Sequence, residues 1–412
     1  MTDYDRRDFM TKAAGGLAAL AVLPELGLAN LPSSKAGLRV GVIGAGRHGR
    51  AILGELAKVE GVQVVALCDP DERRLASGLR RTAGAEGFAT VDAMLTGAAD
   101  GAEIDAVIVA TPTQTHREVA EACIAAGKHT YVETPLAHTA EDCAAIVAAA
   151  RGASVVCAGG FQGRSNPVYK LARGFFKTDS VRDLVSIRAQ HNNKESWRTP
   201  SNDPAREKRL NWKLDPEVST GLAGEWGSQQ FDVAHWYTGK YPTRVRGHGG
   251  IRLWKDGRTI ADTIACDLIF EDGAVMQYGA TLANSYEDTH ELFFGTNAAI
   301  KLAWSHGWLF KESDAATQGW EVYANRVQFH KDEGITLIAD ATKLASQGKL
   351  QDGVGLSHSA LYYALSDFVA SIENSESPAC SISEAARGTA VALAANQAVI
   401  TGNDIEIDLS TL

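Results

Sequence analysis

Short apolar runs alternate with segments of helical periodicity from residue 38 to about residue 160. Short apolar runs are typical of buried strands, and the alanine-rich segments between them are typical of helices. The expected strands are residues 38–43, 62–67, a short one near 88, 105–110, 129–132 and 154–158. Helices are expected at 51–59, 118–126 and 140–150, among others. Strands that alternate with helices predict a parallel sheet with helices on both faces.

The pattern changes after residue 161, where strands dominate. Alternation of apolar and polar residues over 275–281 suits a sheet with one covered face. The expected strands are 184–190, 244–253, 260–270, 274–282, 291–295 and 299–303, and the expected helices are 167–176, 224–236, 357–373 and 383–402. The polar, tryptophan-bearing loop 192–214 is long enough to suggest a functional role. We therefore expect an α/β chain with a first domain at 38–160 and, at 161–412, an α+β domain with a large, mostly antiparallel open sheet.

The first residues have the pattern of a targeting segment. Arg6 and Arg7 precede a weakly apolar run, 13–23, which is typical of a twin-arginine signal peptide. We expect a signal over 1–29, cleaved after Ala29, and a linker over 30–37. This pattern indicates export to the periplasm by the twin-arginine (Tat) machinery. The alternative is an amphipathic leader on a cytoplasmic protein. No run has transmembrane length, so we expect no stable membrane insertion.

Composition narrows the function classes. The chain has 412 residues, 45% hydrophobic and 22% charged, which suits two globular domains. The net charge of −10, without a long basic run, argues against a nucleic-acid partner. The six cysteines show no C-x-x-C spacing, so we expect small buried residues, although one disulfide remains possible in an oxidising compartment. No metal site is expected, since the histidines lack ligand spacing.

A glycine motif follows the first expected strand. Gly44, Gly46 and Gly49 fit G-x-G-x-x-G, with Arg47 and His48 between the last two, and Asp69 lies 20 residues beyond Gly49 at the end of the second strand. The glycines allow a tight turn, close approach of a pyrophosphate and close helix packing, while the acid can bind ribose hydroxyls. The alternative is a glycine-rich surface turn. The motif predicts a bound dinucleotide, with NAD favoured by Asp69 and NADP left possible by Arg73 and Arg74.

Further motifs complete a set that resembles one family. They are Asp69-Pro70-Asp71, the run from Ala110 to His116, Glu133-Thr134-Pro135-Leu136-Ala137, and the run from Glu225 to Asp232. With the glycine motif, they resemble the Gfo/Idh/MocA family (glucose–fructose oxidoreductase, inositol dehydrogenase and relatives). The resemblance implies a Rossmann domain, an open-sheet second domain and an NAD(P)-dependent dehydrogenase of sugars or polyols. It also implies a homo-oligomer formed through the second-domain sheet.

The resemblance assigns roles by position. It implies that the cofactor contacts the loop after the fourth strand and the turn at Glu133, through Thr111, Pro112, Thr113, His116 and Glu133. It implies that Arg164 and Asp232 lie on the substrate side. The chain departs from the family at three positions. Thr134 stands where the family usually has a lysine, Gln229 where it usually has a histidine, and Glu225 where it usually has an aspartate. Neither threonine nor glutamine can act as a general base near neutral pH.

Hydride transfer from a carbinol carbon needs a group that takes the hydroxyl proton. The catalytic candidates are Glu133, Glu225, Gln229, Asp232 and Lys213, and the substrate candidates are Arg164, Trp212, Gln229, Asp232 and His235. Each also has a structural interpretation, as a turn cap, a solvated charge or a rim residue. Glu225 and Asp232 are seven apart, hence roughly on one face of a helix. The tryptophans of the second half favour a carbohydrate cleft, with ordinary packing as the alternative.

Three hypotheses follow. The first is a periplasmic oxidoreductase of sugars, polyols or glycosides with tightly bound NAD. The second is a redox-neutral glycosidase or lyase that oxidises C3 transiently, as in the NAD-dependent N-acetylgalactosaminidases, which also lack the usual lysine. The third is a non-catalytic nucleotide-binding protein.

Overall fold

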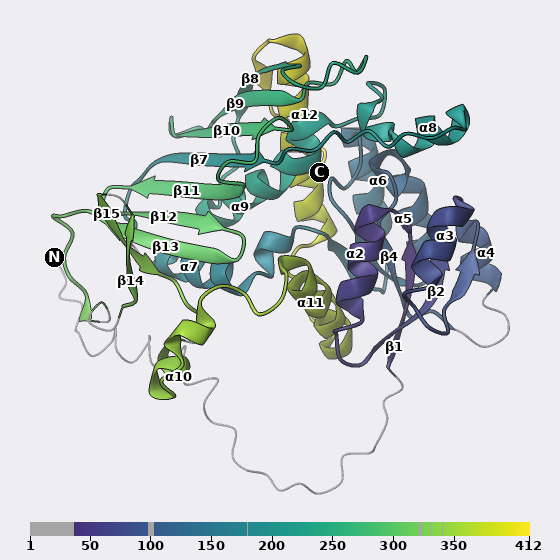
Figure 1. Cartoon of the computed structure of the whole chain (residues 1–412), viewed down its shortest axis with the longest axis horizontal. Helices are drawn as coiled ribbons and strands as arrows, with labels where there is room; N and C mark the ends of the chain where they lie inside the picture. Colours follow the sequence, from purple (N-terminus) through teal and green to yellow (C-terminus); the bar gives the residue numbers. More distant parts are fainter. Residues whose placement is uncertain are drawn as a thin grey trace, which may run out of the picture. The chain divides into compact units, whose positions relative to one another are not determined.

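The computed structural model describes residues 37–412 apart from 98–102, 179, 320, 322–323, 330 and 340 (Figure 1). The signal expected at 1–29 and the linker up to residue 36 therefore lie outside the described residues. Residues 38–412 form one compact unit that contains two sheets. Among the residues described, no helix is both long and apolar enough to cross a membrane.

The first sheet is parallel throughout, in the order β3-β2-β1-β4-β5-β6. Its strands are β1 (Leu38–Ile43), β2 (Val62–Cys68), β3 (Glu86–Phe88), β4 (Ala106–Val109), β5 (His129–Val132) and β6 (Cys157–Gly159). The strand order reverses between β1 and β4, and such a switch point opens a crevice at the carboxyl ends of the strands. The expected sheet is confirmed, although β6 begins three residues later than expected, at Cys157.

Helices cover both faces of this sheet, as the alternating pattern predicted. They are α2 (Arg47–Leu56), α3 (Glu72–Leu79), α4 (Val91–Gly97), α5 (His116–Ala125) and α6 (Ala140–Arg151). One further helix comes from the end of the chain: α11 (Ala360–Asn374) packs on α2. Leu361, Leu365 and Phe368 of α11 join Val40 and Ile108 in one apolar core. The packing of this apolar stripe therefore brings α11, from the end of the chain, against the first sheet and its helices.

The second sheet has ten strands in the order β14-β15-β13-β12-β11-β7-β10-β9-β8-β16. They are β7 (Leu184–Asn192), β8 (Arg244–Gly250), β9 (Thr263–Ile269), β10 (Val275–Thr281), β11 (Thr289–Gly295), β12 (Ala298–Ala303), β13 (His306–Lys311), β14 (Arg326–Phe329), β15 (Asp332–Thr336) and β16 (Ile405–Glu406). Of its strand pairs, β7–β10 is parallel and the others are antiparallel. The mostly antiparallel sheet is confirmed; β13 to β16 were not expected, because these short strands carry little alternation.

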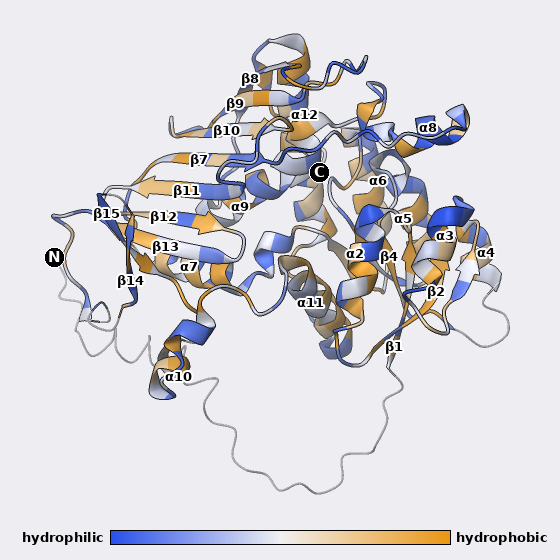
Figure 2. Ribbon diagram, in the orientation of Figure 1, coloured by the Kyte–Doolittle hydropathy of each residue, from blue (hydrophilic) through white to orange (hydrophobic). Residues whose placement is uncertain are grey.

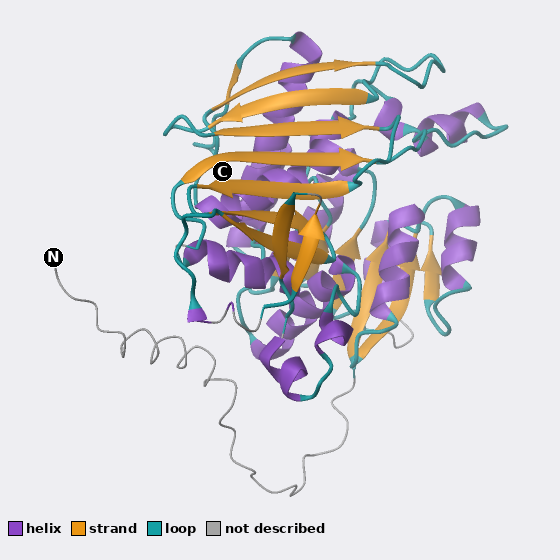
Figure 3. Ribbon diagram, turned by 60° about the vertical axis from the view of Figure 1, so that its left-hand side comes forward, coloured by secondary structure: helices purple, strands orange, loops and turns teal. Residues whose placement is uncertain are grey.

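Helices lie behind the second sheet in Figure 3. They are α7 (Pro167–Lys177), α9 (Ser228–Thr238) and α12 (Ile382–Thr401), and α12 also packs against α6 of the first domain. Met276, Tyr278 and Ala280 alternate toward this covered face, as the sequence pattern predicted. Two short helical segments, α10 (Ala341–Ser346) and the turn Leu350–Gly353, precede α11. All six cysteines are free.

A long excursion follows β7. We call residues 193–214 the arm; it contains the short helix α8 (Pro204–Leu210) and the turn Trp212–Leu214. Figure 2 shows α8 largely hydrophilic, in contrast to the orange hydrophobic residues of β1, β2 and β4. After the arm, Ala223–Gly227 forms a π-helical turn that leads directly into α9. Such turns are frequent at functional sites, and this one carries Glu225.

Candidate active site

The glycine turn joins β1 to α2, and its backbone is possible only with glycine. Gly44 has φ +100°, and a Cβ there would lie 2.4 Å from the carbonyl oxygen of Ala110. A Cβ on Gly49 would lie 1.8 Å from the carbonyl oxygen of Gly44. On Gly46 a Cβ would meet only a guanidinium nitrogen of Arg74, at 3.8 Å, and this residue caps α2 without a side-chain hydrogen bond. The first N–H groups of α2 thus face open space, as an anion site requires.

Asp69 fastens this turn to the end of β2. It is buried, its Oδ2 accepts the N–H of Ala45 at 2.8 Å, and its Oδ1 accepts the N–H of Asp71 at 2.8 Å. Each carboxylate oxygen keeps a second acceptor position for a ribose hydroxyl. The glycine turn and the acid therefore form one prepared surface at the switch point of the sheet.

His116 contacts the backbone of the loop after β4 and supports that loop. Its Nε2 lies 2.9 Å from the carbonyl oxygen of Thr111, and its Nδ1 lies 3.1 Å from that of Pro135. His116 is buried, and burial lowers its pKa. Both ring nitrogens of His116 are thus used to hold two backbone segments together, and its expected contact with the cofactor stays a prediction. Thr111 and Pro112 lie on the outer part of this loop, where both are partly exposed.

Lys213 and Glu225 form an ion pair where the two domains meet. Nζ of Lys213 lies 2.9 Å from Oε2 of Glu225, whose other oxygen accepts the hydroxyl of Thr220 at 2.8 Å. The hydroxyl of Thr113, in the loop after β4, lies 3.4 Å from the same Oε1. The Glu225 side chain is 4% exposed and that of Lys213 34%. A cation from the arm is thus held beside the cofactor-side loop.

Aromatic rings surround this cation. Nζ of Lys213 lies 5.1 Å from the ring centre of Trp197 and 5.5 Å from that of Trp212. We call Thr113, Lys213, Glu225, Trp197 and Trp212 the junction cluster. Flat rings next to a charged group suit a ligand with both C–H faces and hydroxyls.

The two residues that depart from the family motifs contact each other. Nε2 of Gln229 donates to Oγ1 of Thr134 at 2.8 Å and to the carbonyl oxygen of Gly160 at 2.9 Å. Oε1 of Gln229 accepts the N–H of Gln162 at 3.1 Å. Neither side chain titrates near neutral pH. This pair ties α9 to the turn after β5 and can orient a hydroxyl, but it cannot relay a proton.

His48 and Glu133 form a second ion pair nearby. Nε2 of His48 lies 3.0 Å from Oε1 of Glu133, which is buried, whereas about half of the His48 side chain is exposed. Burial acts to lower the pKa of His48, and the positive charges of Lys213 and Arg47 act in the same direction. The Glu133 carboxylate outweighs these effects, so the pKa of His48 is raised. The sequence placed both residues near the cofactor without predicting that they pair.

Asp232 and Arg164 form a buried ion pair with each other. Nε and Nη2 of Arg164 donate to the two carboxylate oxygens of Asp232, each at 2.8 Å, and Nη1 pairs with Glu384 of α12. The two side chains are 1% and 3% exposed. In this structure the two side chains satisfy each other out of contact with solvent, and their expected substrate contact stays a prediction. Glu225, in the π-helical turn before α9, pairs with Lys213, whereas Asp232 pairs with Arg164, so the two acids have separate partners.

His235 lies apart from the junction cluster. Its ring stacks on Tyr241 with centres 3.6 Å apart, and Nδ1 lies 3.2 Å from the carbonyl oxygen of Lys240. These contacts belong to the end of α9 and the following turn. The structure places His235 in a packing position, and its expected substrate role stays a prediction.

The arm makes two contacts that the sequence analysis did not single out. Glu195 pairs with Arg47 at 2.9 Å, and Arg206 of α8 pairs with Asp71 at 2.6 Å. The length and polarity of the loop indicated a function, but the partners lie 148 and 135 residues away along the chain. Pairs this distant in sequence leave no local signal.

Comparison with known proteins agrees with this architecture. Residues 38–161 match the family model of the GFO/IDH/MocA oxidoreductases, described as an NAD-binding Rossmann fold, and residues 180–301 match the model of the GFO/IDH/MocA C-terminal domain. Together the two models span more than half of the chain. This chain belongs to the GFO/IDH/MocA family.

Relatives and solved structures of this family add detail. Two inositol 2-dehydrogenases of Saccharopolyspora erythraea are 32% and 38% identical over 213 and 218 residues, in each case 51% of this chain and 57% of the relative. The chain thus matches little more than half the length of these proteins. A glycosyl hydrolase family 109 protein of a Shewanella strain is 32% identical over 165 residues, 34% of this chain and 36% of the relative. A levoglucosan dehydrogenase solved with NADH and L-sorbose shares the fold, with TM-score 0.71 and 19% identity over 90% of this chain and 99% of that one.

Proposed function

We propose that this protein is an NAD-dependent oxidoreductase that transfers hydride between nicotinamide and the carbinol carbon of a sugar, polyol or glycoside. The contact between Thr113 and Glu225 carries the proposal, because it sets the cofactor-side loop against the Lys213–Glu225 pair. The chain's own geometry fits a dinucleotide, since the turn requires glycine at 44 and 49 and leaves room beside Gly46 at the start of α2. The names of the inositol and levoglucosan dehydrogenases support the same substrate class.

Each part of the site has a task in this proposal. The N–H groups at the start of α2 bind the pyrophosphate, and Asp69 binds ribose hydroxyls. The bound nicotinamide supplies hydride transfer. Lys213, held in place by Glu225, stabilises negative charge on the substrate oxygen, and His48, oriented by Glu133, takes the hydroxyl proton when its imidazole is neutral. Thr134 and Gln229 orient a neighbouring hydroxyl, while Trp197 and Trp212 receive the C–H face of the ring.

The first experiment identifies the nucleotide. Purified protein is denatured and the released small molecules are analysed by mass spectrometry, and the intact protein is titrated with NADH and NADPH by fluorescence. Sugars, polyols and glycosides are then screened at the nicotinamide absorbance. We expect NAD(H) to be bound and reduced by at least one carbohydrate. A folded protein that neither carries nor takes up a nicotinamide nucleotide would refute the proposal, whereas bound nucleotide without turnover would favour a binding protein.

A second candidate is a redox-neutral glycosidase that oxidises C3 transiently and eliminates the aglycone. The similarity to glycosyl hydrolase family 109 proteins favours it, as does the missing lysine at Thr134. Chromogenic aryl glycosides distinguish the two. Release of the aryl group without added NAD supports the glycosidase, and turnover that requires an external acceptor supports the oxidoreductase.

We further propose that residues 1–29 direct export through the twin-arginine pathway. The support is the pattern of Arg6 and Arg7 before a weakly apolar run. Because free NAD is scarce outside the cytoplasm, an exported enzyme of this class gains from a cofactor that stays bound.

A further inference from the structure

The arm contacts the first domain at two points that flank the expected cofactor. Oε2 of Glu195 lies 2.9 Å from Nη1 of Arg47, the first residue of α2. Nε of Arg206 lies 2.6 Å from Oδ2 of Asp71, just beyond the end of β2. The start of α2 is where the pyrophosphate lies, and the end of β2 is where the adenosine ribose lies. The two ion pairs therefore mark the two ends of the adenosine diphosphate half of the dinucleotide.

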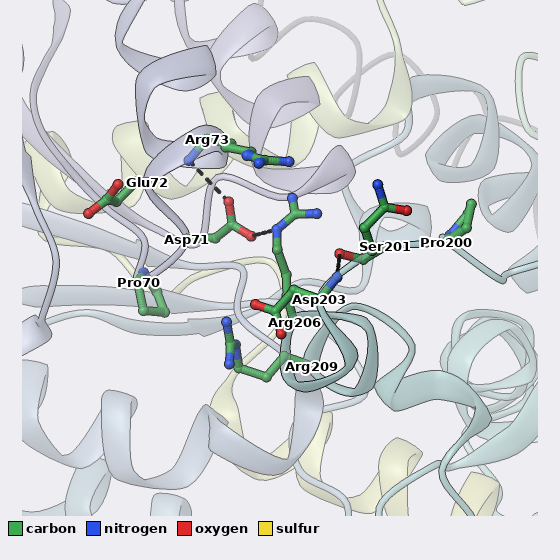
Figure 4. A pocket seen from close by; sticks show the side chains of 10 residues that line it. Pro70, Asp71, Glu72, Arg73, Pro200, Ser201, Asp203, Arg206 and Arg209 are labelled. Atoms are coloured by element: carbon green, nitrogen blue, oxygen red, sulfur yellow. Dashed lines mark hydrogen bonds and ion pairs between the residues drawn. The ribbon is translucent and has the colours of Figure 1, made fainter.

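A cavity of about 800 Å³ lies between α8 and the turn after β2 (Figure 4). One wall is Pro70–Arg73, directly after Asp69, and the other belongs to the arm, with Arg206 and Arg209. Figure 4 shows the Arg206 side chain reaching Asp71. Guanidinium planes stack on aromatic rings, so this cavity has walls suited to an adenine base next to the ribose acid.

The arm is braced before any ligand binds. Nη2 of Arg258 donates to the carbonyl oxygen of Ser196 at 2.7 Å, and Arg198 pairs with Asp256 at 2.8 Å. Within the arm, Asn211 accepts the N–H of Thr199 at 2.6 Å and donates to its carbonyl oxygen at 2.9 Å. A segment held in this way loses little further conformational freedom when it encloses a ligand.

We propose that the adenosine half of the cofactor site is shared by the two domains, with the arm as its outer wall. The first domain supplies the glycine turn and Asp69. The arm supplies Arg206 and Arg209 and is closed by the Arg206–Asp71 and Glu195–Arg47 pairs. A nucleotide enclosed in this way leaves only when the arm lifts, so these pairs slow its dissociation. This inference rests on the proposed function and adds the reason why the cofactor stays bound.

The test measures NADH dissociation from the full-length protein. NADH-loaded protein is mixed with excess ADP-ribose, and the fluorescence decay is followed by stopped flow. We expect Arg206→Ala to release NADH about tenfold faster, which corresponds to about 1.4 kcal/mol from one partly buried ion pair. Lys208→Ala removes the same charge from the exposed face of the same helix and should leave the rate unchanged. Arg206→Lys should recover part of the loss.

Glu195→Gln opens the second contact and keeps the inference testable if Arg206→Ala folds poorly. We expect an intermediate increase in the rate, and a larger one in the double variant. If both single variants release NADH at the rate of the unaltered protein, the arm is not a wall of the site and this inference fails, although the oxidoreductase proposal stands. If the unaltered protein binds no NADH at all, both fail.

Discussion

Nε2 of Gln229 lies 2.8 Å from Oγ1 of Thr134, so the two residues that replace the family's titratable pair are hydrogen-bonded to each other across the domain junction. A lysine at 134 and a histidine at 229 would instead bring a cation and an imidazole to this place. In this chain, charged side chains reach the junction from other segments: Lys213 from the arm and His48 from the start of α2. In our proposal, His48 therefore takes the proton and Lys213 supplies the positive charge.

The contact between Thr134 and Gln229 predicts energetic coupling. Thr134→Val and Gln229→Ala each remove one partner, and the double variant removes both. We expect a coupling energy of about 1 kcal/mol in a double-mutant cycle of urea unfolding, because one neutral hydrogen bond links them. Additive losses would show that the two side chains do not stabilise each other in solution.

Lys213 should be needed for turnover more than for cofactor binding. Lys213→Met removes the cation and leaves the buried Glu225 carboxylate unpaired, so we expect kcat on the best carbohydrate to fall about 100-fold. NADH affinity should change little, and Lys213→Arg should retain part of the activity. Steady-state kinetics and NADH titration check this, with Lys208→Met as the control on α8. An unchanged kcat would remove Lys213 from the mechanism.

The buried pair of Arg164 and Asp232 should govern stability. Both side chains are buried, and Asp232→Asn leaves the Arg164 charge without a charged partner at that position. We therefore expect a loss of about 3 kcal/mol in the free energy of unfolding. The exposed pair of Lys170 and Asp367, at 2.8 Å, is the matched control; Asp367→Asn should cost about 1 kcal/mol at most. A raised KM for Asp232→Asn at unchanged stability would restore Asp232 to the substrate site.

Glu291 should make the fold less stable at alkaline pH. It is a buried residue of β11, where it accepts the Tyr169 hydroxyl at 2.6 Å, and burial raises the pKa of Glu291 from 4.5 to about 7. The protonated form therefore stabilises the fold below pH 4.5, and this contribution is lost as pH rises through about 7. Glu291→Gln should be more stable than the unaltered protein at pH 8, by roughly 3 kcal/mol at the upper limit. Thermal unfolding at pH 5 and pH 8 measures this, and a pH-independent difference would contradict it.

Export should depend on the paired arginines. Replacing Arg6 and Arg7 by lysine keeps the charge but removes the twin-arginine pattern, so we expect the protein to accumulate in the cytoplasm at its full length. Fractionation and N-terminal mass spectrometry of the periplasmic form check this, with cleavage expected after Ala29. Periplasmic protein in the lysine variant would show another route.

The sequence alone determined the two sheets and the glycine turn with Asp69. These features depend on near neighbours: period-two and helical patterns follow from local geometry, and the spacing of Gly44, Gly46 and Gly49 encodes one turn. Only the tertiary structure decided which charges pair. Lys213 with Glu225, Arg206 with Asp71 and Arg164 with Asp232 meet because separate elements dock. Burial then commits Asp232 to Arg164, whereas the Lys213 side chain stays partly exposed beside buried Glu225.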